Sequence, residues 1–459
     1  MKHMTLARMA QACGGIYIGR NEDADREVVS ITTDSRKAEP GGLFAAIPGA
    51  RVDGHDFIPS VFEKGVLGVI SEKRLPEGSG NYILVDHTIR ALGAIAAYYL
   101  EQLQIPVVGI TGSVGKTSTK EMIAAVLSQK YRTLKTAGNF NNDLGLPLTI
   151  FRLREEDEIA VLEIGISHFG EMHVLAGIAK PDTCVITNIG QCHLEFLGDR
   201  DGVLRAKSEI FDFLKEDGYI ILNGEDDKLE TIDEVKGIRP VFFGFGKEHA
   251  VWADQVKPQG LLGVACRIHT EKGAFDVTVP IPGLHMVQNA LAGTAVGLHY
   301  GLSLDEIRAG IESLQAVDGR FHIVRTEYCT VIDDCYNANP MSMKSSLGVL
   351  ADALGRKVAI LGDMGELGPD EAALHREVGE YAGTLDVDRF LLAGPLSRNI
   401  ADGLLTVHPE ADVICYGSLQ ELLRALAGQV EKGDTVLVKA SHFMHFEKIV
   451  EALENLEER

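Results

Sequence analysis

One short segment limits the folds open to this chain more than any other. The apolar run Val107–Ile110 leads into Gly109-Ile-Thr-Gly-Ser-Val-Gly-Lys-Thr117, and a helical pattern follows, with one apolar face formed by Met122, Ile123, Val126 and Leu127. Strand, glycine loop and helix in this order are typical of a phosphate-binding loop, where backbone N–H groups and the helix dipole face phosphate oxygens. The general pattern has glycine at position 110, where Ile110 stands. Because all three parts agree, a chance glycine turn is rejected and nucleotide binding is predicted.

Polar residues near the predicted loop provide candidates for a metal site. In such a loop Lys116 would reach the β and γ phosphates, and the Thr117 hydroxyl would hold Mg²⁺. Glu163 follows the apolar run 159–162. A carboxylate there is costly unless it meets a cation, so we prefer a metal ligand over an exposed strand end. His193 also follows an apolar strand, but a lone histidine is more often structural, and Lys207 would by default be a solvated helix lysine.

Along the rest of the chain, short apolar strands alternate with helical segments, which predicts α/β architecture with parallel, helix-covered sheets. Strands are expected at 43–47, 66–70, 82–85, 107–110, 159–164, 183–187, 219–222, 330–333, 358–361, 389–392, 413–416 and 435–438, with a strand-rich stretch over 240–282 and helices at 89–103 and 286–300. A length of 459 residues suggests about three domains. We expect a small N-terminal α/β domain (1–104), a central nucleotide-binding domain (105–316) and a Rossmann-like doubly wound domain (317–459). The last domain lacks a G-x-G-x-x-G sequence after its first strand, so NAD binding is not expected.

The composition argues against several kinds of partner. Lys and Arg total 44 against 66 for Asp and Glu, and the formal charge of −22 disfavours nucleic acid and anionic membranes. Seven cysteines without a CxxC pair indicate reduced thiols. The N-terminal residues lack the apolar stretch of a signal peptide, and no apolar run reaches about 18 residues. A soluble, cytoplasmic protein is predicted.

Taken together, these segments resemble the Mur ligase family, ATP-dependent amide-forming enzymes of peptidoglycan precursor synthesis. Besides the phosphate loop, the matching segments are Thr136-Ala-Gly-Asn-Phe-Asn-Asn-Asp-Leu-Gly-Leu-Pro147, Glu163-Ile-Gly, Thr187-Asn-Ile-Gly-Gln-Cys-His193, Ala206-Lys-Ser-Glu-Ile-Phe211, Asn289-Ala-Leu-Ala, Gly319-Arg320 and Asp333-Asp-Cys-Tyr-Asn-Ala-Asn-Pro340. They run through the whole chain in order. Three segments depart from the usual family residues: Gln191-Cys192, Gly293 and Lys439-Ala-Ser-His442.

The resemblance implies ATP and two Mg²⁺ ions in the central domain. The loop residues that would hold ATP are Gly112, Ser113, Val114, Gly115, Lys116, Thr117 and Ser118. Thr117 and Glu163 would hold the first Mg²⁺. His193 would bind the second, helped by Lys207 after carbamylation by CO2. Asn289 would face the adenine, Arg320 would reach the ATP phosphates from the last domain, and Asp334 would contact the ribose side. Lys116, His193, Lys207 and Arg320 are the residues expected to carry catalysis.

Within the family, the nearest likeness is to members that join D-Ala-D-Ala to UDP-MurNAc-tripeptide. It is carried by Tyr336-Asn-Ala-Asn-Pro-Met-Ser-Met343 and by Leu361-Gly-Asp-Met-Gly-Glu-Leu-Gly368 with His375. The resemblance implies that Ser35 and Arg36 of the N-terminal domain hold the UDP part, and Asn139 and Asn142 the muramoyl side. Asp363, Met364 and Glu366 would lie near the incoming D-Ala-D-Ala, in a last domain that closes on ATP. The alternative is that this segment is only the turn that closes a strand.

Two other functions stay open at this stage. One is a sister ligase that adds a single amino acid to a shorter UDP-MurNAc-peptide. The other is a nucleotide switch that uses the same loop without ligation, but such a protein has no use for a second metal site at His193 and Lys207. A monomer acting on small-molecule substrates is expected.

Overall fold

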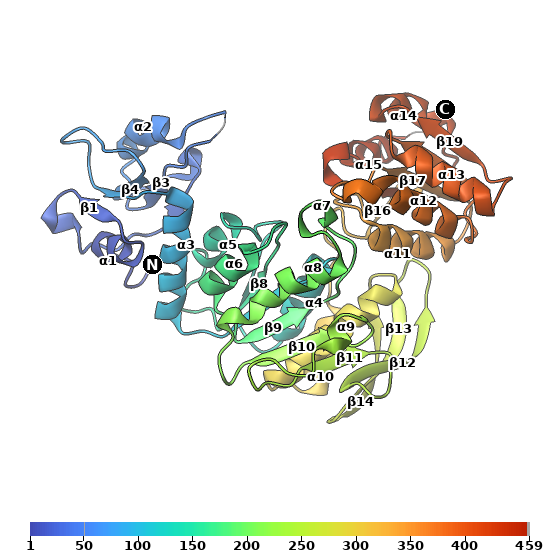
Figure 1. Ribbon diagram of the computed structural model, residues 1–459, viewed down its shortest axis with the longest axis horizontal. Helices are drawn as coiled ribbons and strands as arrows, with labels where there is room; N and C mark the ends of the chain where they lie inside the picture. The colour runs from blue at the N-terminus through green and yellow to red at the C-terminus, as the bar shows by residue number, and fades with distance from the viewer. Residues whose placement is uncertain (50, 457–459) are drawn as a thin grey trace.

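The computed structural model describes residues 1–49 and 51–456 and contains three β-sheets, each with its own helices (Figure 1). The sheets occupy residues 16–84, 107–279 and 322–439. Figure 1 shows the N-terminal part in blue on the left, the central part in green and yellow, and the C-terminal part in orange and red. The predicted three-domain α/β fold class is confirmed, and the boundaries expected after residues 104 and 316 each fall between two sheets.

The N-terminal sheet has the strand order β1-β5-β4-β3-β2, with only β1 antiparallel to its neighbour. Its elements are α1 (Leu6–Ala12), β1 (Ile16–Ile18), β2 (Ile31–Thr32), β3 (Leu43–Ala45), α2 (Ile58–Glu63), β4 (Gly68–Ser71), β5 (Tyr82–Leu84) and α3 (Thr88–Leu103). The long helix α3 also packs on α5 (Gly145–Ile150) and α6 (Glu171–Ala179) of the central part, where the buried Tyr99 hydroxyl donates to the carbonyl of Leu153 over 2.7 Å. This helix therefore joins the first two domains in one core.

The central sheet has nine strands in the order β14-β13-β12-β11-β10-β9-β6-β8-β7. The strands are β6 (Val107–Thr111), β7 (Thr133–Lys135), β8 (Ile159–Glu163), β9 (Thr183–Ile186), β10 (Tyr219–Asn223), β11 (Val241–Gly244), β12 (Val251–Pro258), β13 (Val264–Thr270) and β14 (Gly273–Val279). The pairs from β7 to β12 are parallel, whereas β12, β13 and β14 form an antiparallel meander. Helices in this part are α4 (Lys116–Leu127), α5, α6, α7 (Leu194–Leu197), α8 (Arg200–Ser208), α9 (Leu284–His299) and α10 (Leu304–Glu312).

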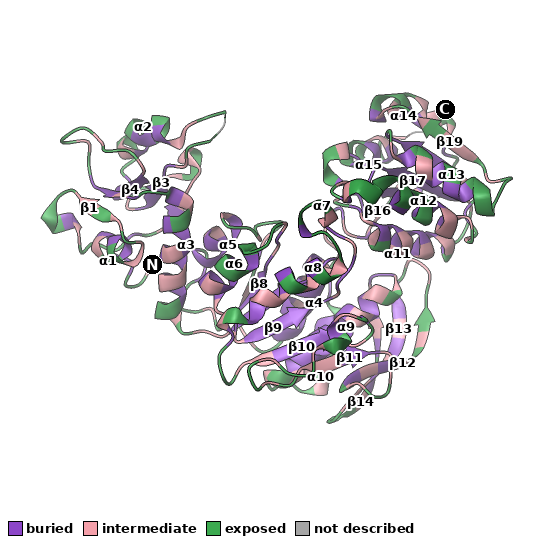
Figure 2. Ribbon diagram, in the orientation of Figure 1, coloured by how far each residue is buried: buried purple, intermediate pink, exposed green. Residues whose placement is uncertain are grey.

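The central strands are apolar throughout because both of their faces are covered. Alternate residues of one strand enter different cores: Val161 packs with α4 and α9, whereas Ala160 and Leu162 pack on the side of α3, α5 and α6. A parallel sheet buried on both faces produces this continuous apolar pattern. Figure 2 shows the resulting buried layer between partly exposed helices.

The C-terminal sheet has the order β15-β16-β20-β17-β18-β19, parallel except for the edge strand β15. Its strands are β15 (His322–Arg325), β16 (Thr330–Asp333), β17 (Lys357–Gly362), β18 (Arg389–Ala393), β19 (Val413–Tyr416) and β20 (Thr435–Lys439). Its helices are α11 (Pro340–Ala351), α12 (Glu371–Ala382), α13 (Ser397–Val407), α14 (Leu419–Ala425) and α15 (Glu447–Glu454). Helix α11 lies close to the N-terminal end of α9. A Cβ added to Gly283, the residue before α9, would lie 3.1 Å from the side chain of Val349 in α11.

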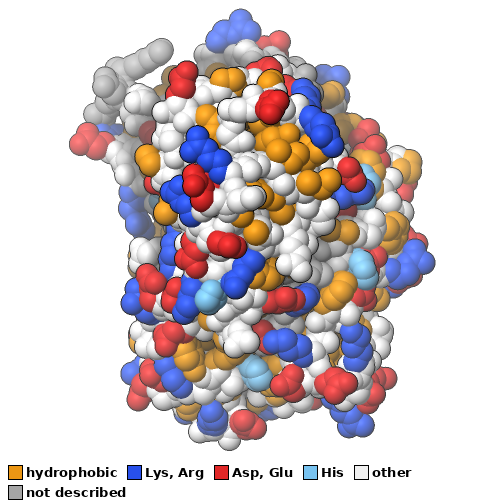
Figure 3. Space-filling model, turned by 90° about the vertical axis from the view of Figure 1, so that its left-hand side faces the viewer, with side chains coloured by type: hydrophobic (Ala, Val, Ile, Leu, Met, Phe, Trp, Pro, Cys, Tyr) orange, Lys and Arg blue, Asp and Glu red, His pale blue; other side chains and the backbone are white. Residues whose placement is uncertain are grey.

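The surface carries charges of both signs. Figure 3, which looks at the N-terminal end, shows Lys and Arg interspersed with Asp and Glu around a group of hydrophobic side chains. Among the described residues, no helix combines the length and the apolar character needed to span a membrane.

Candidate functional site

The predicted phosphate loop joins the end of β6 to the start of α4. Gly112 and Gly115 have φ values of 147° and 81°, which glycine adopts readily. A Cβ at Gly112 would lie 1.9 Å from Thr187 Oγ1, so that side chain leaves room for glycine alone. Ile110, where the general pattern has glycine, is a fully buried residue of β6, and the turn begins two residues later.

The segment that follows β9 holds this loop in shape. Thr187 Oγ1 donates to the carbonyl of Val114 over 2.6 Å, and the Val114 N–H donates to Asn188 Oδ1 over 2.9 Å. Lys116, the first residue of α4, turns back so that its Nζ donates to the Gly112 carbonyl over 2.8 Å. Burial lowers the pKa of Lys116, and the nearby Glu163 opposes this shift. The loop thus presents a desolvated cation beside a helix N-terminus, a combination that suits phosphate.

Glu163 lies at the end of β8, only 2% exposed. Its Oε1 accepts a hydrogen bond from Asn141 Nδ2 over 2.8 Å, but its buried Oε2 has no hydrogen-bond partner among the described residues. The nearest cation is Lys120 Nζ, 3.9 Å away, which donates to the carbonyl of Thr136 over 2.7 Å. A buried carboxylate oxygen without a hydrogen bond is costly unless a cation meets it.

These residues fit a magnesium ion. The Thr117 side chain and Glu163 both line the same cleft, and a hard cation prefers such oxygen ligands. No group of three or more His, Cys, Asp or Glu side chains in residues 1–49 and 51–456 is arranged to hold a metal alone. Substrate oxygens and water would therefore have to complete the coordination, as is usual for Mg²⁺ at phosphates.

His193 and Lys207 take different positions near the loop. His193 lines the cleft at the start of α7, and its Nδ1 lies 2.6 Å from Glu366 Oε2 of the C-terminal domain. This hydrogen bond lowers the pKa of Glu366. Lys207 is buried in α8 at 1% exposure, and burial lowers its pKa to about 8. Its Nζ makes no hydrogen bond or ion pair with any residue that the structure describes, and Lys207 is not among the cleft-lining residues.

Asn289, on α9, lies behind the loop and lines the cleft. Its Oδ1 accepts a hydrogen bond from Thr119 Oγ1 over 2.8 Å, which fixes the amide against α4. About one turn before it on α9, His285 contacts the C-terminal domain through Ser345 Oγ, 2.9 Å from Nδ1. Burial lowers the pKa of His285 to about 4, so this imidazole is neutral.

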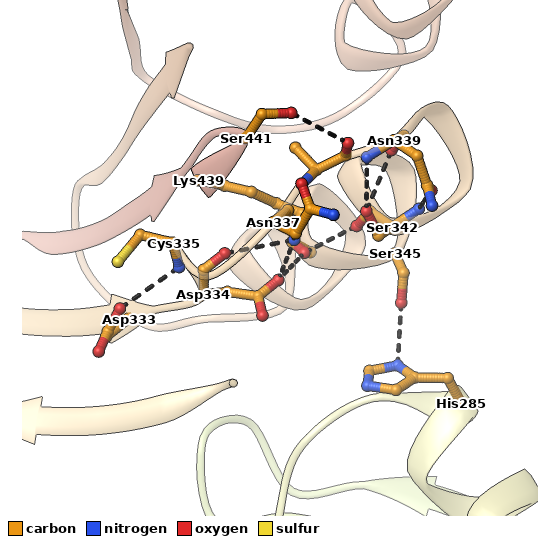
Figure 4. A network of polar contacts seen from close by, with 12 residues as sticks. His285, Asp333, Asp334, Cys335, Asn337, Asn339, Ser342, Ser345, Lys439 and Ser441 are labelled. Atoms are coloured by element: carbon orange, nitrogen blue, oxygen red, sulfur yellow. Dashed lines mark hydrogen bonds and ion pairs between the residues drawn. The ribbon is translucent and has the colours of Figure 1, made fainter. Parts of the chain in front are cut away.

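The C-terminal side of the cleft is organised by a buried ion pair (Figure 4). Lys439 Nζ, at the end of β20, lies 2.5 Å from Asp334 Oδ2 and donates to the carbonyl of Asn337 over 3.0 Å. Ser346 Oγ donates to the same Asp334 oxygen over 2.7 Å. Asp334 still lines the cleft, with Oδ2 committed to these donors. Lys439, in a segment that departs from the family pattern, therefore holds the loop after β16.

Arg320 approaches the loop from the segment between the last two sheets. Its guanidinium lies 4.0 Å from the centre of the Tyr336 ring, in a cation–π contact. Arg320 and the phosphate loop line one cleft of about 920 Å³ between the central and C-terminal domains. Other residues that line it include Asn139, Asn142, Ser113, Val114, Gly115, Ser118, Ile166, Phe169, Val174 and Met341. The cleft thus combines charged phosphate contacts with an apolar wall.

Five predicted substrate residues lie outside the cleft lining. Ser35 and Arg36 belong to the N-terminal domain, where Arg36 is exposed and pairs with Asp34 over 2.9 Å. Asp363 and Met364 belong to the turn after β17, and their contact with D-Ala-D-Ala stays a prediction. The Asp363 carboxylate accepts the N–H of Ser397 over 2.7 Å at the start of α13, and Met364 is fully buried. Glu366, the fifth, contacts His193.

Several site residues were not predicted from the sequence. Asn141 lies within the matching segment 136–147, between the predicted residues Asn139 and Asn142, and its contact with Glu163 is visible only in the fold. Lys120 stands four residues after Lys116 on the same helix face, a spacing that could have indicated it. His285 carried no local signal for its contact with Ser345 of the C-terminal domain, and Tyr336 carried none for its contact with Arg320.

Fold and site together define a three-domain P-loop nucleotide-binding protein whose cleft is completed by its last domain. Family models match three segments: "Mur ligase family, catalytic domain" at 27–100, "Mur ligase middle domain" at 110–297 and "Mur ligase, glutamate ligase domain" at 319–442. The chain belongs to the Mur ligase family.

Relatives extend this likeness over nearly the whole length. The UDP-N-acetylmuramoyl-tripeptide–D-alanyl-D-alanine ligase of Bacillus subtilis is 39% identical over 92% of each chain, and that of Escherichia coli 37% over 96% of each. A crystal structure of MurF from Acinetobacter baumannii is 34% identical, covers 99% of each chain and superposes with a TM-score of 0.89. MurF ligase from Thermotoga maritima in complex with ADP is 30% identical, covers 93% of this chain and 97% of that one, and has a TM-score of 0.81.

Proposed function

We propose that this chain joins D-alanyl-D-alanine to UDP-N-acetylmuramoyl-tripeptide, converting ATP to ADP and phosphate and yielding UDP-MurNAc-pentapeptide for peptidoglycan. The observation that carries the proposal is one cleft that unites the phosphate loop and Glu163 with Arg320 and Asp334. Relatives of 37–39% identity bear the name of this ligase, and the Thermotoga maritima relative binds ADP.

The chemistry runs in two steps. The free carboxylate of the tripeptide attacks the γ-phosphorus of ATP in line, giving an acyl phosphate and ADP. The amine of D-Ala-D-Ala then attacks the acyl carbon, loses a proton, and the tetrahedral intermediate expels inorganic phosphate to leave the amide. Lys116 and Arg320 neutralise charge on the transferring phosphoryl group from opposite sides of the cleft. Asn289 and Asp334 hold the nucleoside end of ATP.

Two Mg²⁺ ions would supply further charge neutralisation at the phosphoryl oxygens. Thr117 and Glu163 would hold the first, in keeping with the buried Glu163 oxygen that has no hydrogen bond among the described residues. His193 would hold the second, helped by Lys207 if that side chain carries a carbamate. A pKa of about 8 leaves part of the Lys207 amine neutral near neutral pH, the form that attacks CO2, and the carbamate converts a buried cation into an anion.

Each domain has a separate role in this proposal. Residues 1–104 bind UDP through Ser35 and Arg36, residues 105–316 bind ATP and the muramoyl side through Asn139 and Asn142, and residues 317–459 receive D-Ala-D-Ala and close on ATP. The protein works in the cytoplasm as a monomer, since all seven cysteines are free thiols and one chain builds the whole cleft.

The direct test is phosphate release from ATP with UDP-MurNAc-tripeptide and D-Ala-D-Ala, omitting each component in turn. Release that needs all three, with a product mass increased by one D-Ala-D-Ala residue, is expected. Release with a single amino acid and a shorter UDP-peptide would instead assign a sister ligase. Nucleotide binding without release with any acceptor would refute ligation.

A further inference from the structure

One polar contact joins the candidate metal site to the C-terminal domain. His193 follows β9 of the central sheet and Glu366 follows β17 of the C-terminal sheet, 173 residues later, yet Nδ1 and Oε2 lie 2.6 Å apart. Both residues have left-handed backbone conformations, with φ of 51° for His193 and 59° for Glu366. Non-glycine residues rarely adopt this conformation, so the surrounding structure holds the backbone of both residues in place at the contact.

The segment that carries Glu366 is anchored on both sides. Met364 before it is fully buried, and Leu367 after it is 1% exposed. Gly368 then approaches α7 so closely that a Cβ there would lie 3.3 Å from the backbone nitrogen of Glu195. The segment is therefore docked against the helix that begins at His193, whereas the Glu366 side chain is 51% exposed and is held by its contact with His193.

Because Nδ1 of His193 contacts Glu366, Nε2 is the ring nitrogen that stays available to a ligand in the cleft. A histidine that ligates a metal almost always donates its other ring N–H to a carboxylate or carbonyl, which fixes the tautomer and the ring orientation. With its Nδ1 proton donated to Glu366, His193 keeps its acceptor lone pair on Nε2, and His193 lines the cleft whereas Glu366 does not.

We propose that Glu366 is a positioning residue that fixes the tautomer and orientation of His193, so that the second metal site of the central domain is complete only when the C-terminal domain is docked. This rests on the proposed function, which makes His193 a metal ligand. It replaces the expectation that Glu366 contacts D-Ala-D-Ala directly. The same contact makes the position of the C-terminal domain a condition for metal binding.

The test measures Mn²⁺ binding to the full-length protein with ADP, by electron paramagnetic resonance titration, beside steady-state kinetics. Glu366→Ala and Glu366→Met are expected to weaken the His193-dependent Mn²⁺ site by about 10- to 100-fold. Glu366→Gln, whose amide oxygen still accepts from Nδ1, is expected to restore most of the affinity. Glu195→Gln removes a carboxylate from the exposed side of α7 and serves as the matched control, with unchanged affinity.

The variants also separate this idea from the proposed function. If His193→Ala keeps every Mn²⁺ site, the metal role of His193 fails, and the proposed two-metal site fails with it. If His193→Ala loses a site but Glu366→Ala and Glu366→Met bind Mn²⁺ as the wild type does, the positioning role is overturned. An increased KM for D-Ala-D-Ala in those variants, with unchanged Mn²⁺ affinity, would assign Glu366 to direct substrate contact.

Discussion

The Lys439–Asp334 ion pair allows a sharp test of how the C-terminal side of the cleft is held. The two side chains are 2% and 6% exposed, with Nζ and Oδ2 2.5 Å apart. Lys439→Met removes the cation, leaving the Asp334 carboxylate with Ser346 as its remaining donor and the carbonyl of Asn337 without its lysine. Breaking a buried pair in this way costs about 3–5 kcal/mol, because an uncompensated charge stays buried.

A matched control lies in the same domain. Lys344 and Glu377 are also 2.5 Å apart, but their side chains are 30% and 47% exposed. Lys344→Met is therefore expected to cost about 0–1 kcal/mol. The double variant Lys439→Met/Asp334→Asn removes both charges and should recover about 1–3 kcal/mol of the loss.

Hydrogen exchange of the full-length protein is the suitable assay, since three domains do not unfold in one two-state step. Peptides over β16 and β20 should exchange roughly two to three and a half orders of magnitude faster in Lys439→Met, at about 1.4 kcal/mol per tenfold. Peptides over the central sheet should not change. Equal, small effects of Lys439→Met and Lys344→Met would refute the reasoning, since burial would then make no difference to the pair.

Three further predictions concern the central domain. Gly112→Ala forces a Cβ against Thr187 Oγ1 and should weaken ADP binding at least about 100-fold in calorimetry. The control Gly428→Ala has open space around its Cβ and should bind ADP normally. Normal ADP binding by both variants would contradict the loop geometry. Glu163→Gln removes the carboxylate that would meet Mg²⁺, so phosphate release should fall at least about 100-fold. Undiminished release would argue against Glu163 as a metal ligand. In ¹³C-bicarbonate, the wild-type protein should show a carbamate resonance that Lys207→Met lacks, and an identical resonance in that variant would exclude Lys207 as its source.

Local patterns were enough to predict much of the fold. The expected strand at 330–333 is β16 as observed, and the expected helix at 89–103 is α3 with one more residue. Short edge strands such as β1, β2 and β7 escaped prediction, because two or three residues carry no periodicity and exist only through pairing with a neighbour. For the segment 362–365 the sequence left two alternatives open, a substrate loop or a turn that closes a strand. The contact of Asp363 with the start of α13 was beyond any local pattern, because Ser397 lies 34 residues away.

The sequence by itself determined the phosphate loop, the apolar parallel strands and the acidic residue at the end of β8, because each depends on neighbours along one strand or helix. Only the tertiary structure decided that Lys439 pairs with Asp334, 105 residues away, and that Glu366 reaches His193, 173 residues away. Those contacts depend on the order and register of β16, β20 and β17 and on how the last domain docks. The burial of these side chains and the positions of their partners depend on several distant segments at once, so no local pattern in the sequence contains them.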